Sequence, residues 1–202
     1  MNALILVDIQ NDFTPNKPGG ALAVPHGNQV IEIANQLMTD FDLVIATQDW
    51  HPPHHQSFAS QHPKHKVGDM IDLDGLPQIL WPDHCIQNTI GAAFCDQLNH
   101  NGIHHVIQKG TDANIDSYSG FFDNGHRKAT GLADLLHDHD VKEVFIMGLA
   151  TDYCVKFTAL DAVELGFKTH LILNGCRGVE LQAGDCERAI QEMKKAGIFI
   201  AE

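Results

Sequence analysis

Paired cysteines are missing from this sequence, although it contains five cysteines. They lie far apart and form no CxxC pair, so a disulfide framework is excluded as the basis of the fold, and the cytoplasm is the expected location. The N-terminal stretch MNALILVDIQNDF reaches Asp8 too early for a secretory signal peptide. The cysteines are Cys85, Cys95, Cys154, Cys176 and Cys186.

Basic charge is also scarce, because 13 Lys and Arg residues stand against 26 Asp and Glu, for a formal net charge of −13. Nucleic acids and anionic membranes bind to basic patches, so neither is an expected partner. Long apolar runs are absent as well, and the short apolar runs that the sequence contains could not span a bilayer. We therefore expect a protein that binds neither nucleic acid nor membrane.

What the 202 residues do contain is an alternation of short apolar runs with segments of helical spacing. The apolar runs cover 3–8, 43–49, 105–110, 144–148, 170–175 and 197–201, and their length and β-branched content are typical of buried parallel strands. Helical spacing is found over 28–40, 88–99, 128–140, 152–166 and 184–197. This alternation predicts an α/β fold, a Rossmann-like parallel sheet flanked by helices, as a single domain over 1–202.

Residues 50–86 interrupt the alternation and hold many of the 14 histidines. A segment this long without clear periodicity is usually functional or disordered in a compact domain. Its apolar residues, among them Trp50, Phe58 and Trp81, argue against disorder. We predict a folded insertion within the domain.

Four of the predicted strands deliver chemically useful residues to one rim of the sheet. The first ends in Asp8, the second in Asp49 and the third in Lys109, and the fourth leads into a turn that carries Cys154. Ligands bind beyond the carboxyl ends of such strands. Taken singly, each aspartate could cap the next element and Lys109 could be solvated, but together they predict a site.

Cys154 has the surroundings expected of a nucleophile. Asp152 is predicted to cap the following helix, which places Cys154 in its first turn, where the helix dipole favours a thiolate. Lys109 would lower the pKa of the thiol further, and Asp8 could accept its proton. Cys85, beside His84, is the rival as nucleophile or ligand, whereas Cys95 is expected to pack on an amphipathic helix.

A metal site is predicted where the insertion begins. Asp49 and His51 are two residues apart, and the prolines after His51 favour an extended chain in which both side chains face the same way. His84 is a third ligand, which leaves positions open for water or substrate. Zinc is the expected ion, although iron or manganese suit the same ligands. An additional ligand, His54 or His55, stays open, and so does the alternative that the loop histidines are simply solvated.

Six stretches in the same order resemble the nicotinamidases of the isochorismatase-like (cysteine hydrolase) superfamily. They are LVDIQNDF, TQDWHPPHHQSFA, WPDHCIQNT, QKG, DSYSGFFDN and GLATDYCVKFTALDA, and they extend over almost the whole chain. The resemblance implies hydrolysis of nicotinamide to nicotinate and ammonia in NAD salvage. The small-molecule partner is then nicotinamide or a related pyridine carboxamide, and a homo-oligomer is left open.

The resemblance also implies roles for individual residues. Asp8, Lys109 and Cys154 would form the catalytic triad, and Asp49, His51 and His84 would hold one divalent metal ion. A cis peptide bond would precede Ala150, with the Ala150 and Cys154 N–H groups as the oxyanion hole. Phe13, Trp81 and Tyr118 would line the pocket for the ring. The alternatives are another cysteine-dependent amidase of the superfamily and a non-catalytic metal-binding protein on the same fold.

Overall fold

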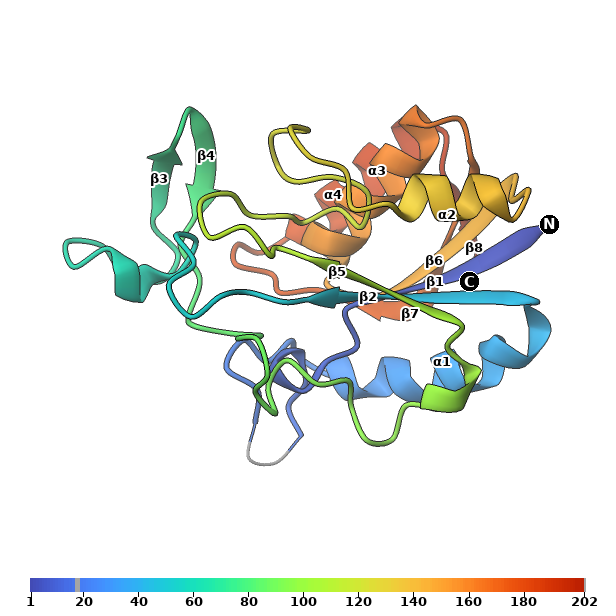
Figure 1. Ribbon diagram of the computed structural model, residues 1–202, viewed down its shortest axis with the longest axis horizontal. Coiled ribbons are helices and arrows are strands. Elements are labelled where there is room, and N and C mark those ends of the chain that lie inside the picture. The colour runs from blue at the N-terminus through green and yellow to red at the C-terminus, as the bar shows by residue number, and fades with distance from the viewer. Residues whose placement is uncertain (17–18, 202) are drawn as a thin grey trace.

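A six-stranded sheet forms the core of the computed structural model, which describes residues 1–16 and 19–201 (Figure 1). Its strands are β1 (Asn2–Val7), β2 (Leu43–Asp49), β5 (His105–Lys109), β6 (Glu143–Leu149), β7 (Lys168–Arg177) and β8 (Phe199–Ala201). They lie in the order β5-β2-β1-β6-β7-β8, and every neighbouring pair is parallel. Ranked along the chain, this is the 3-2-1-4-5-6 order of a doubly wound Rossmann sheet. The predicted fold class is confirmed.

Helices cover both faces of the sheet, with α1 on one side and α2, α3 and α4 on the other (Figure 1). Their bounds are Val30–Leu37, Leu132–Asp138, Lys156–Glu164 and Asp185–Lys195, respectively. Because both faces are covered, residues 3–7 of β1 are fully buried. Short 3₁₀ turns span Asn11–Phe13, Gly27–Gln29, Met38–Asp40, Ala59–Gln61 and His100–Gly102. Within residues 1–16 and 19–201, every helix is too short or too polar to cross a membrane.

The insertion after β2 is folded, as predicted. It contains an antiparallel hairpin, β3 (Met70–Leu73) and β4 (Leu76–Ile79), which lies at the left of Figure 1, on the side toward which β2 points. Phe58 and Leu80 are fully buried and anchor the insertion to the body. The chain then returns beside the end of β2, because the His51 amide donates to the Cys85 carbonyl and the Gln87 amide donates to the His51 carbonyl. This return brings His84 next to His51.

One predicted helix, over 88–99, is wrong. This segment consists of turns, and Ile90 is 84% exposed instead of facing the core. Its backbone carbonyls are used elsewhere: those of Gly91 and Ala93 accept hydrogen bonds from the amides of Asp12 and Asn11. The segment therefore pairs with the loop after β1, a long-range contact that its helical spacing does not reveal. Cys95 is buried as expected, but in this irregular segment and not on a helix.

Candidate active site

The predicted rim exists, and its centre is the point where the strand order reverses between β1 and β6. Asp8 directly follows β1 and has a positive φ of 49°, and the turn after β6 carries Cys154. Gly148 makes this approach of the two strands feasible, because a Cβ there would lie 2.1 Å from the Val7 carbonyl oxygen. Crevices at such reversals are where ligands bind in doubly wound sheets.

Lys109 lies at the centre of the site and contacts Asp8, Asp49 and Cys154. Its Nζ lies 2.5 Å from Asp49 Oδ1, 2.9 Å from Asp8 Oδ2, 2.9 Å from the Ser117 carbonyl oxygen and 3.4 Å from Cys154 Sγ. Asp8, Asp49 and Cys154 each offer an atom within 4.8 Å of the others. The sequence predicted that acid, lysine and thiol would meet, but not that Lys109 would also bind Asp49 and so join the thiol site to the predicted metal site.

Burial and neighbouring charges shift the pKa values of Lys109 and the groups around it. Burial would lower the pKa of Lys109, but Asp49 and Asp8 outweigh it and raise that pKa well above its ordinary value. Burial raises the pKa of the Cys154 thiol well above its usual range, although Lys109 opposes the rise. Burial likewise raises the pKa of Asp8 against the pull of Lys109. The net shift of the Cys154 pKa is thus upward, opposite to the lowering expected from the sequence, although Lys109 acts in the expected direction.

The turn that carries Cys154 differs from the predicted helix start. Residues Thr151–Val155 form a π-helical turn before α3, and the cap position is Ala150, without a side-chain cap. Asp152 is not the N-cap, because its carboxylate accepts hydrogen bonds from the amides of Val179 (2.9 Å) and Glu180 (2.8 Å). The expected cis peptide bond, Leu149–Ala150, is present.

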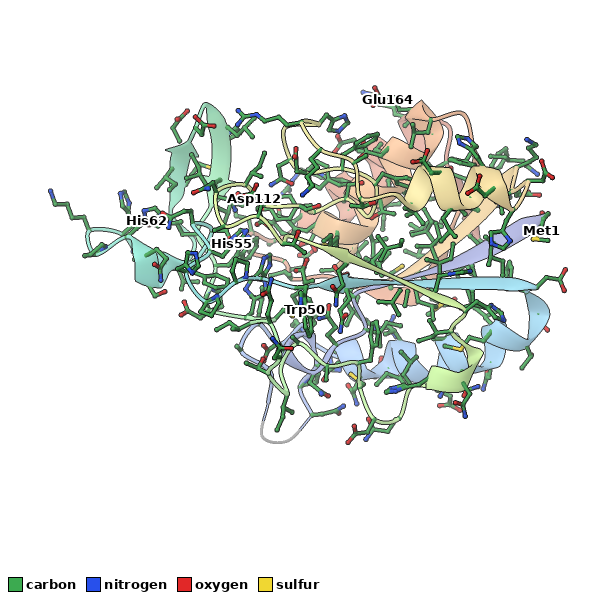
Figure 2. The ribbon with its side chains drawn as sticks, viewed as in Figure 1. Met1, Trp50, His55, His62, Asp112 and Glu164 are labelled. Atoms are coloured by element: carbon green, nitrogen blue, oxygen red, sulfur yellow. The ribbon has the colours of Figure 1, made fainter. Side chains whose placement is uncertain are left out.

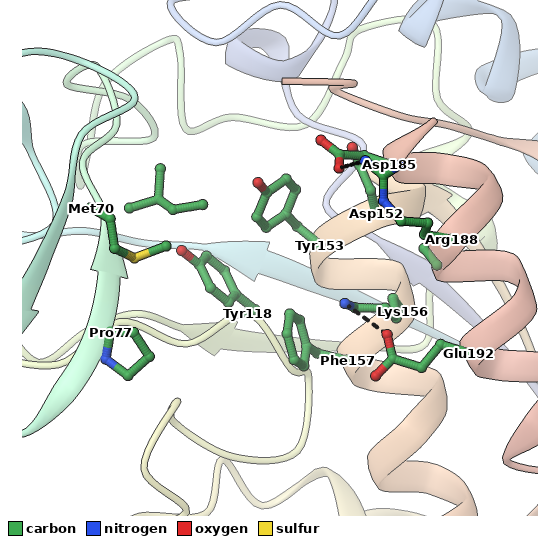
Figure 3. A pocket seen from close by; sticks show the side chains of 12 residues that line it. Met70, Pro77, Tyr118, Asp152, Tyr153, Lys156, Phe157, Asp185, Arg188 and Glu192 are labelled. Atoms are coloured by element: carbon green, nitrogen blue, oxygen red, sulfur yellow. Dashed lines mark hydrogen bonds and ion pairs between the residues drawn. The ribbon is translucent and has the colours of Figure 1, made fainter. Parts of the chain in front are cut away.

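Asp152 thus fastens a wall of the site, since Val179 lines the pocket in front of Cys154. Asp152 itself lies beside the start of α4, near Asp185 (Figure 3). We expect Asp152→Ala to lower the free energy of unfolding by about 1–3 kcal/mol, because two amides lose their acceptor. Urea denaturation measures the loss, and Asp152→Asn, which keeps one acceptor oxygen, should lose less. Equal stability of Asp152→Ala and the wild type would show that Asp152 does not stabilise the backbone at Val179 and Glu180.

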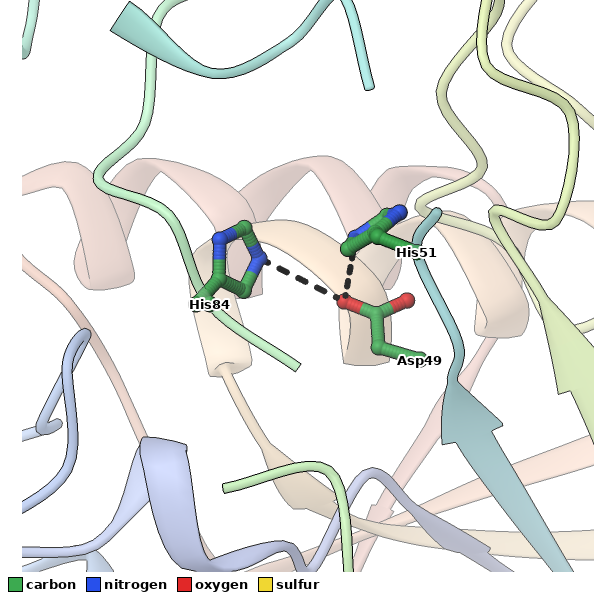
Figure 4. A group of neighbouring side chains, drawn as sticks. All are labelled: Asp49, His51 and His84. Carbon is green, nitrogen blue, oxygen red and sulfur yellow. Dashed lines mark ion pairs between the residues drawn. The ribbon is translucent and has the colours of Figure 1, made fainter. Parts of the chain in front are cut away.

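The three predicted metal ligands come together (Figure 4). Asp49 Oδ2 lies 3.4 Å from His51 Nε2 and 3.7 Å from His84 Nε2. The Nδ1 atoms of the two rings lie 2.9 Å from the Gly110 carbonyl oxygen and 2.8 Å from that of Pro82. As donors to these carbonyls, both rings keep the Nε2 lone pair for an ion. Gly110 permits this contact, because a Cβ there would lie 2.4 Å from the His51 ring.

Two observations test whether these residues fit a divalent ion. His51 Nε2 is a buried nitrogen without a hydrogen-bond partner among the described residues, which is costly unless something binds it. Although burial lowers the pKa of His51, Asp49 outweighs it and raises that pKa, so the site attracts positive charge. One carboxylate oxygen and two imidazole nitrogens suit zinc, iron or manganese. The residues fit the predicted metal.

The two histidines left open by the sequence have different surroundings. His54 is exposed, whereas His55 is fully buried. His55 belongs to a second group of potential ligands, with His51 and Asp116, and not to the group of Asp49, His51 and His84. Burial lowers the pKa of His55 to about 4, so its imidazole is neutral.

A pocket lies between the thiol and the metal ligands, and the predicted Phe13, Trp81 and Tyr118 are among its walls. The Tyr118 hydroxyl accepts hydrogen bonds from Trp81 Nε1 (3.0 Å) and Gln78 Nε2 (3.2 Å), which fixes both rings. The cysteine among the described lining residues is Cys154, whereas its rival Cys85 is fully buried in the core cluster. Tyr118 and Tyr153 also border a larger neighbouring cavity between the β3–β4 hairpin and α4 (Figure 3).

Sequence reasoning missed several residues of the site, of which Gln10 is the clearest. Its side-chain amide donates to the Asp49 carbonyl and accepts from the Asp49 amide, both at 2.8 Å. Because β1 turns away at Asp8, it offers no backbone partner to Asp49, the last residue of β2. The Gln10 side chain makes these hydrogen bonds instead. Tyr153, Asp116 and Val179 were also missed as pocket residues. The adjacency of Tyr153 to Cys154 was the one available signal.

A thiol, a lysine and a carboxylate in contact at the switch point of a doubly wound sheet define a class, the α/β proteins with a cysteine centre. Residues 2–201 match the isochorismatase domain, so the chain belongs to the isochorismatase family. It is 52% identical to the nicotinamidase of Escherichia coli strain K12, over 96% of this chain and 92% of that protein.

Solved structures agree with this membership. The yeast nicotinamidase Pnc1p bound to the inhibitor nicotinaldehyde is 33% identical, with a TM-score of 0.92 over 100% of both chains. The pyrazinamidase of Pyrococcus horikoshii in complex with zinc is 38% identical, with a TM-score of 0.80 over 100% of this chain and 98% of that one. The resemblance read from the sequence motifs is confirmed.

Proposed function

We propose that the protein is a nicotinamidase, an amidohydrolase that converts nicotinamide to nicotinate and ammonia in NAD salvage. The observation that carries the proposal is Cys154 Sγ 3.4 Å from Lys109 Nζ and near Asp8, at the floor of an aromatic pocket beside three potential metal ligands. The 52% identity to the Escherichia coli nicotinamidase over nearly the full chain supports this substrate. Free thiols throughout the chain are consistent with the predicted cytoplasmic location.

In the proposed mechanism, Asp8 takes the proton of the Cys154 thiol as the sulfur attacks the amide carbon. Lys109 compensates the negative charge that forms between Asp8 and the sulfur. The N–H groups of Ala150 and Cys154 receive the carbonyl oxygen as it becomes negative, and one such donor is worth about 2.7–4 kcal/mol in a comparable enzyme. Asp8 then returns the proton to the departing nitrogen, which leaves as ammonia. Asp8 next activates a water molecule, which releases nicotinate from the thioester and restores the thiol.

Asp49, His51 and His84 would hold one divalent ion at the other end of the pocket. When bound, the ion would supply a positive charge that attracts the ring nitrogen of the substrate. Zinc is the proposed metal, and the zinc in the Pyrococcus horikoshii pyrazinamidase supports it. Phe13, Trp81 and Tyr118 would hold the flat ring between them.

The function is tested by incubating the purified, zinc-loaded protein with nicotinamide and measuring ammonia and nicotinate in parallel. Benzamide is the matched control substrate, since it has the same shape but lacks the ring nitrogen. We expect rapid release from nicotinamide and much slower release from benzamide. No ammonia from nicotinamide would refute the function, and equal rates for the two amides would remove the proposed contact between ion and ring nitrogen.

A further inference from the structure

The Thr47 side chain, which the proposed mechanism does not use, contacts the carboxylate of Asp8. We propose that Thr47 is a positioning residue that keeps Asp8 oriented for proton transfer with Cys154. The Thr47 hydroxyl donates a hydrogen bond to Asp8 Oδ1 at 2.6 Å and accepts one from the Asp8 amide at 3.2 Å. Thr47 and Asp8 are both fully buried. The inference rests on the proposed function, which makes Asp8 the proton acceptor.

The contact forms where the hydrogen-bonded pairing of β1 and β2 stops. The last paired residues of the two strands are Leu6 and Ala46. Asp8 then turns away with its positive φ of 49°, so its amide needs an acceptor other than the β2 backbone. Thr47, which follows Ala46 in β2, supplies that acceptor from its side chain. The turn that brings Asp8 into the site is therefore stabilised by Thr47.

The loop around Gly120 fixes the rotamer of Thr47. A Cβ at Gly120 would lie 2.9 Å from the Thr47 methyl carbon, so glycine is what lets this loop pack so closely on the methyl group. The loop is itself held in place, because the Gly120 amide donates to Thr158 Oγ1 at 2.9 Å and its carbonyl accepts from Thr130 Oγ1 at 2.6 Å. With the methyl group packed there, the hydroxyl of Thr47 is directed at Asp8.

The two oxygens of Asp8 thereby have different partners. Oδ1 accepts the hydrogen bond from Thr47, whereas Oδ2 lies 2.9 Å from Lys109 Nζ. Asp8 and Cys154 offer atoms within 4.8 Å of each other. Without the hydroxyl, Oδ1 loses its donor and the carboxylate can turn either oxygen toward Lys109, so the orientation needed for proton transfer is no longer fixed. Substrate binding should be preserved, because Thr47 is outside the set of described residues that line the pocket.

Steady-state hydrolysis of nicotinamide by Thr47→Val tests the inference, since valine keeps the shape of threonine and removes the hydroxyl. We expect kcat to fall about 10- to 100-fold, the cost of losing a hydrogen bond to a charged group, and KM to stay within about twofold of the wild type. Thr47→Ser, which keeps the hydroxyl, should retain most of the wild-type kcat. In an Asp8→Asn background, Thr47→Val should change kcat by less than about twofold, because the group that it orients is gone.

Thr169→Val is the matched control. Thr169 is also a buried threonine of the main sheet, and its hydroxyl donates to the Phe167 carbonyl at 3.0 Å. It pairs with Val144 at the end of the sheet where Met1 lies, away from the end of β2 that leads to Trp50 (Figure 2). Its kcat and KM should equal those of the wild type.

Alkylation of Cys154 by iodoacetamide, followed by mass spectrometry of the peptide that contains it, tests the same contact without nicotinamide. The rate should fall about tenfold or more in Thr47→Val and stay near that of the wild type in Thr47→Ser and Thr169→Val. If circular dichroism shows that Thr47→Val does not fold, Thr47→Ala is compared with Thr47→Ser, because both lack the methyl group and they differ in the hydroxyl alone.

The inference is refuted if folded Thr47→Val keeps the kcat or the alkylation rate of the wild type, or if its loss of kcat is as large in the Asp8→Asn background. Failure of the proposed function would appear separately, as a wild type that releases no ammonia from nicotinamide. The alkylation rates would then still decide the role of Thr47.

Discussion

Cys154→Ala is expected to abolish nicotinamide hydrolysis, with a loss of about 10⁶-fold, as in a comparable enzyme that loses its nucleophile. The sulfur forms the bond to the substrate, and alanine has no atom that can replace it. The fold should persist, because the ion pairs of Lys109 with Asp8 and Asp49 do not depend on the thiol. Ammonia release measures the loss, and thermal unfolding and zinc content verify that the protein is otherwise intact.

Cys85→Ala is the matched control for this experiment. Cys85 is also buried, and it adjoins the proposed metal ligand His84, but its hydrogen bonds to the surroundings are made by its backbone. Its carbonyl accepts from the His51 amide, and its amide donates to Asp12 Oδ2 at 2.7 Å. Alanine keeps both contacts, so activity should stay within a few-fold of the wild type. Substantial activity in Cys154→Ala, or its loss in Cys85→Ala alone while the protein stays folded, would transfer the nucleophilic role to Cys85.

Asp8→Asn is expected to reduce the rate of hydrolysis by about 10²–10⁴-fold, the usual contribution of a general acid–base group. Because burial raises the pKa of the Cys154 thiol, its proton has to be removed during the reaction, and the departing nitrogen then needs a proton. Asparagine has nearly the same shape as aspartate but can neither accept that proton nor return it. Steady-state ammonia release over a range of pH is the measurement.

The fold should tolerate Asp8→Asn, because Lys109 keeps its ion pair with Asp49 and its hydrogen bond to the Ser117 carbonyl. Asp112→Asn, which changes an exposed aspartate in the same way, should leave the rate unchanged. A rate for Asp8→Asn within about tenfold of the wild type would assign the proton transfer to another group.

Much of the architecture was predictable because its cause is local. The six strands of the main sheet and four of the helices follow from hydrophobic periodicity, which reports burial without reference to partners, whereas the strands of the β3–β4 hairpin were not predicted. The carboxyl ends of parallel strands share one edge, so Asp8, Asp49, Lys109 and Cys154 could be placed together from their positions in the chain. The wrong helix over 88–99 had the right periodicity, but its carbonyls bind the amides of Asn11 and Asp12, about 80 residues away.

The sequence by itself determined the order of the elements and which residue types reach the rim, because periodicity and strand direction are local properties of the chain. Tertiary structure alone decided that Lys109 joins the thiol to Asp49, that Asp152 holds the 179–180 backbone, and that His55, not His54, faces His51. It also decided that burial raises the pKa of the Cys154 thiol. Each of these depends on distances and burial between segments far apart in the chain, which spacing along the sequence does not encode.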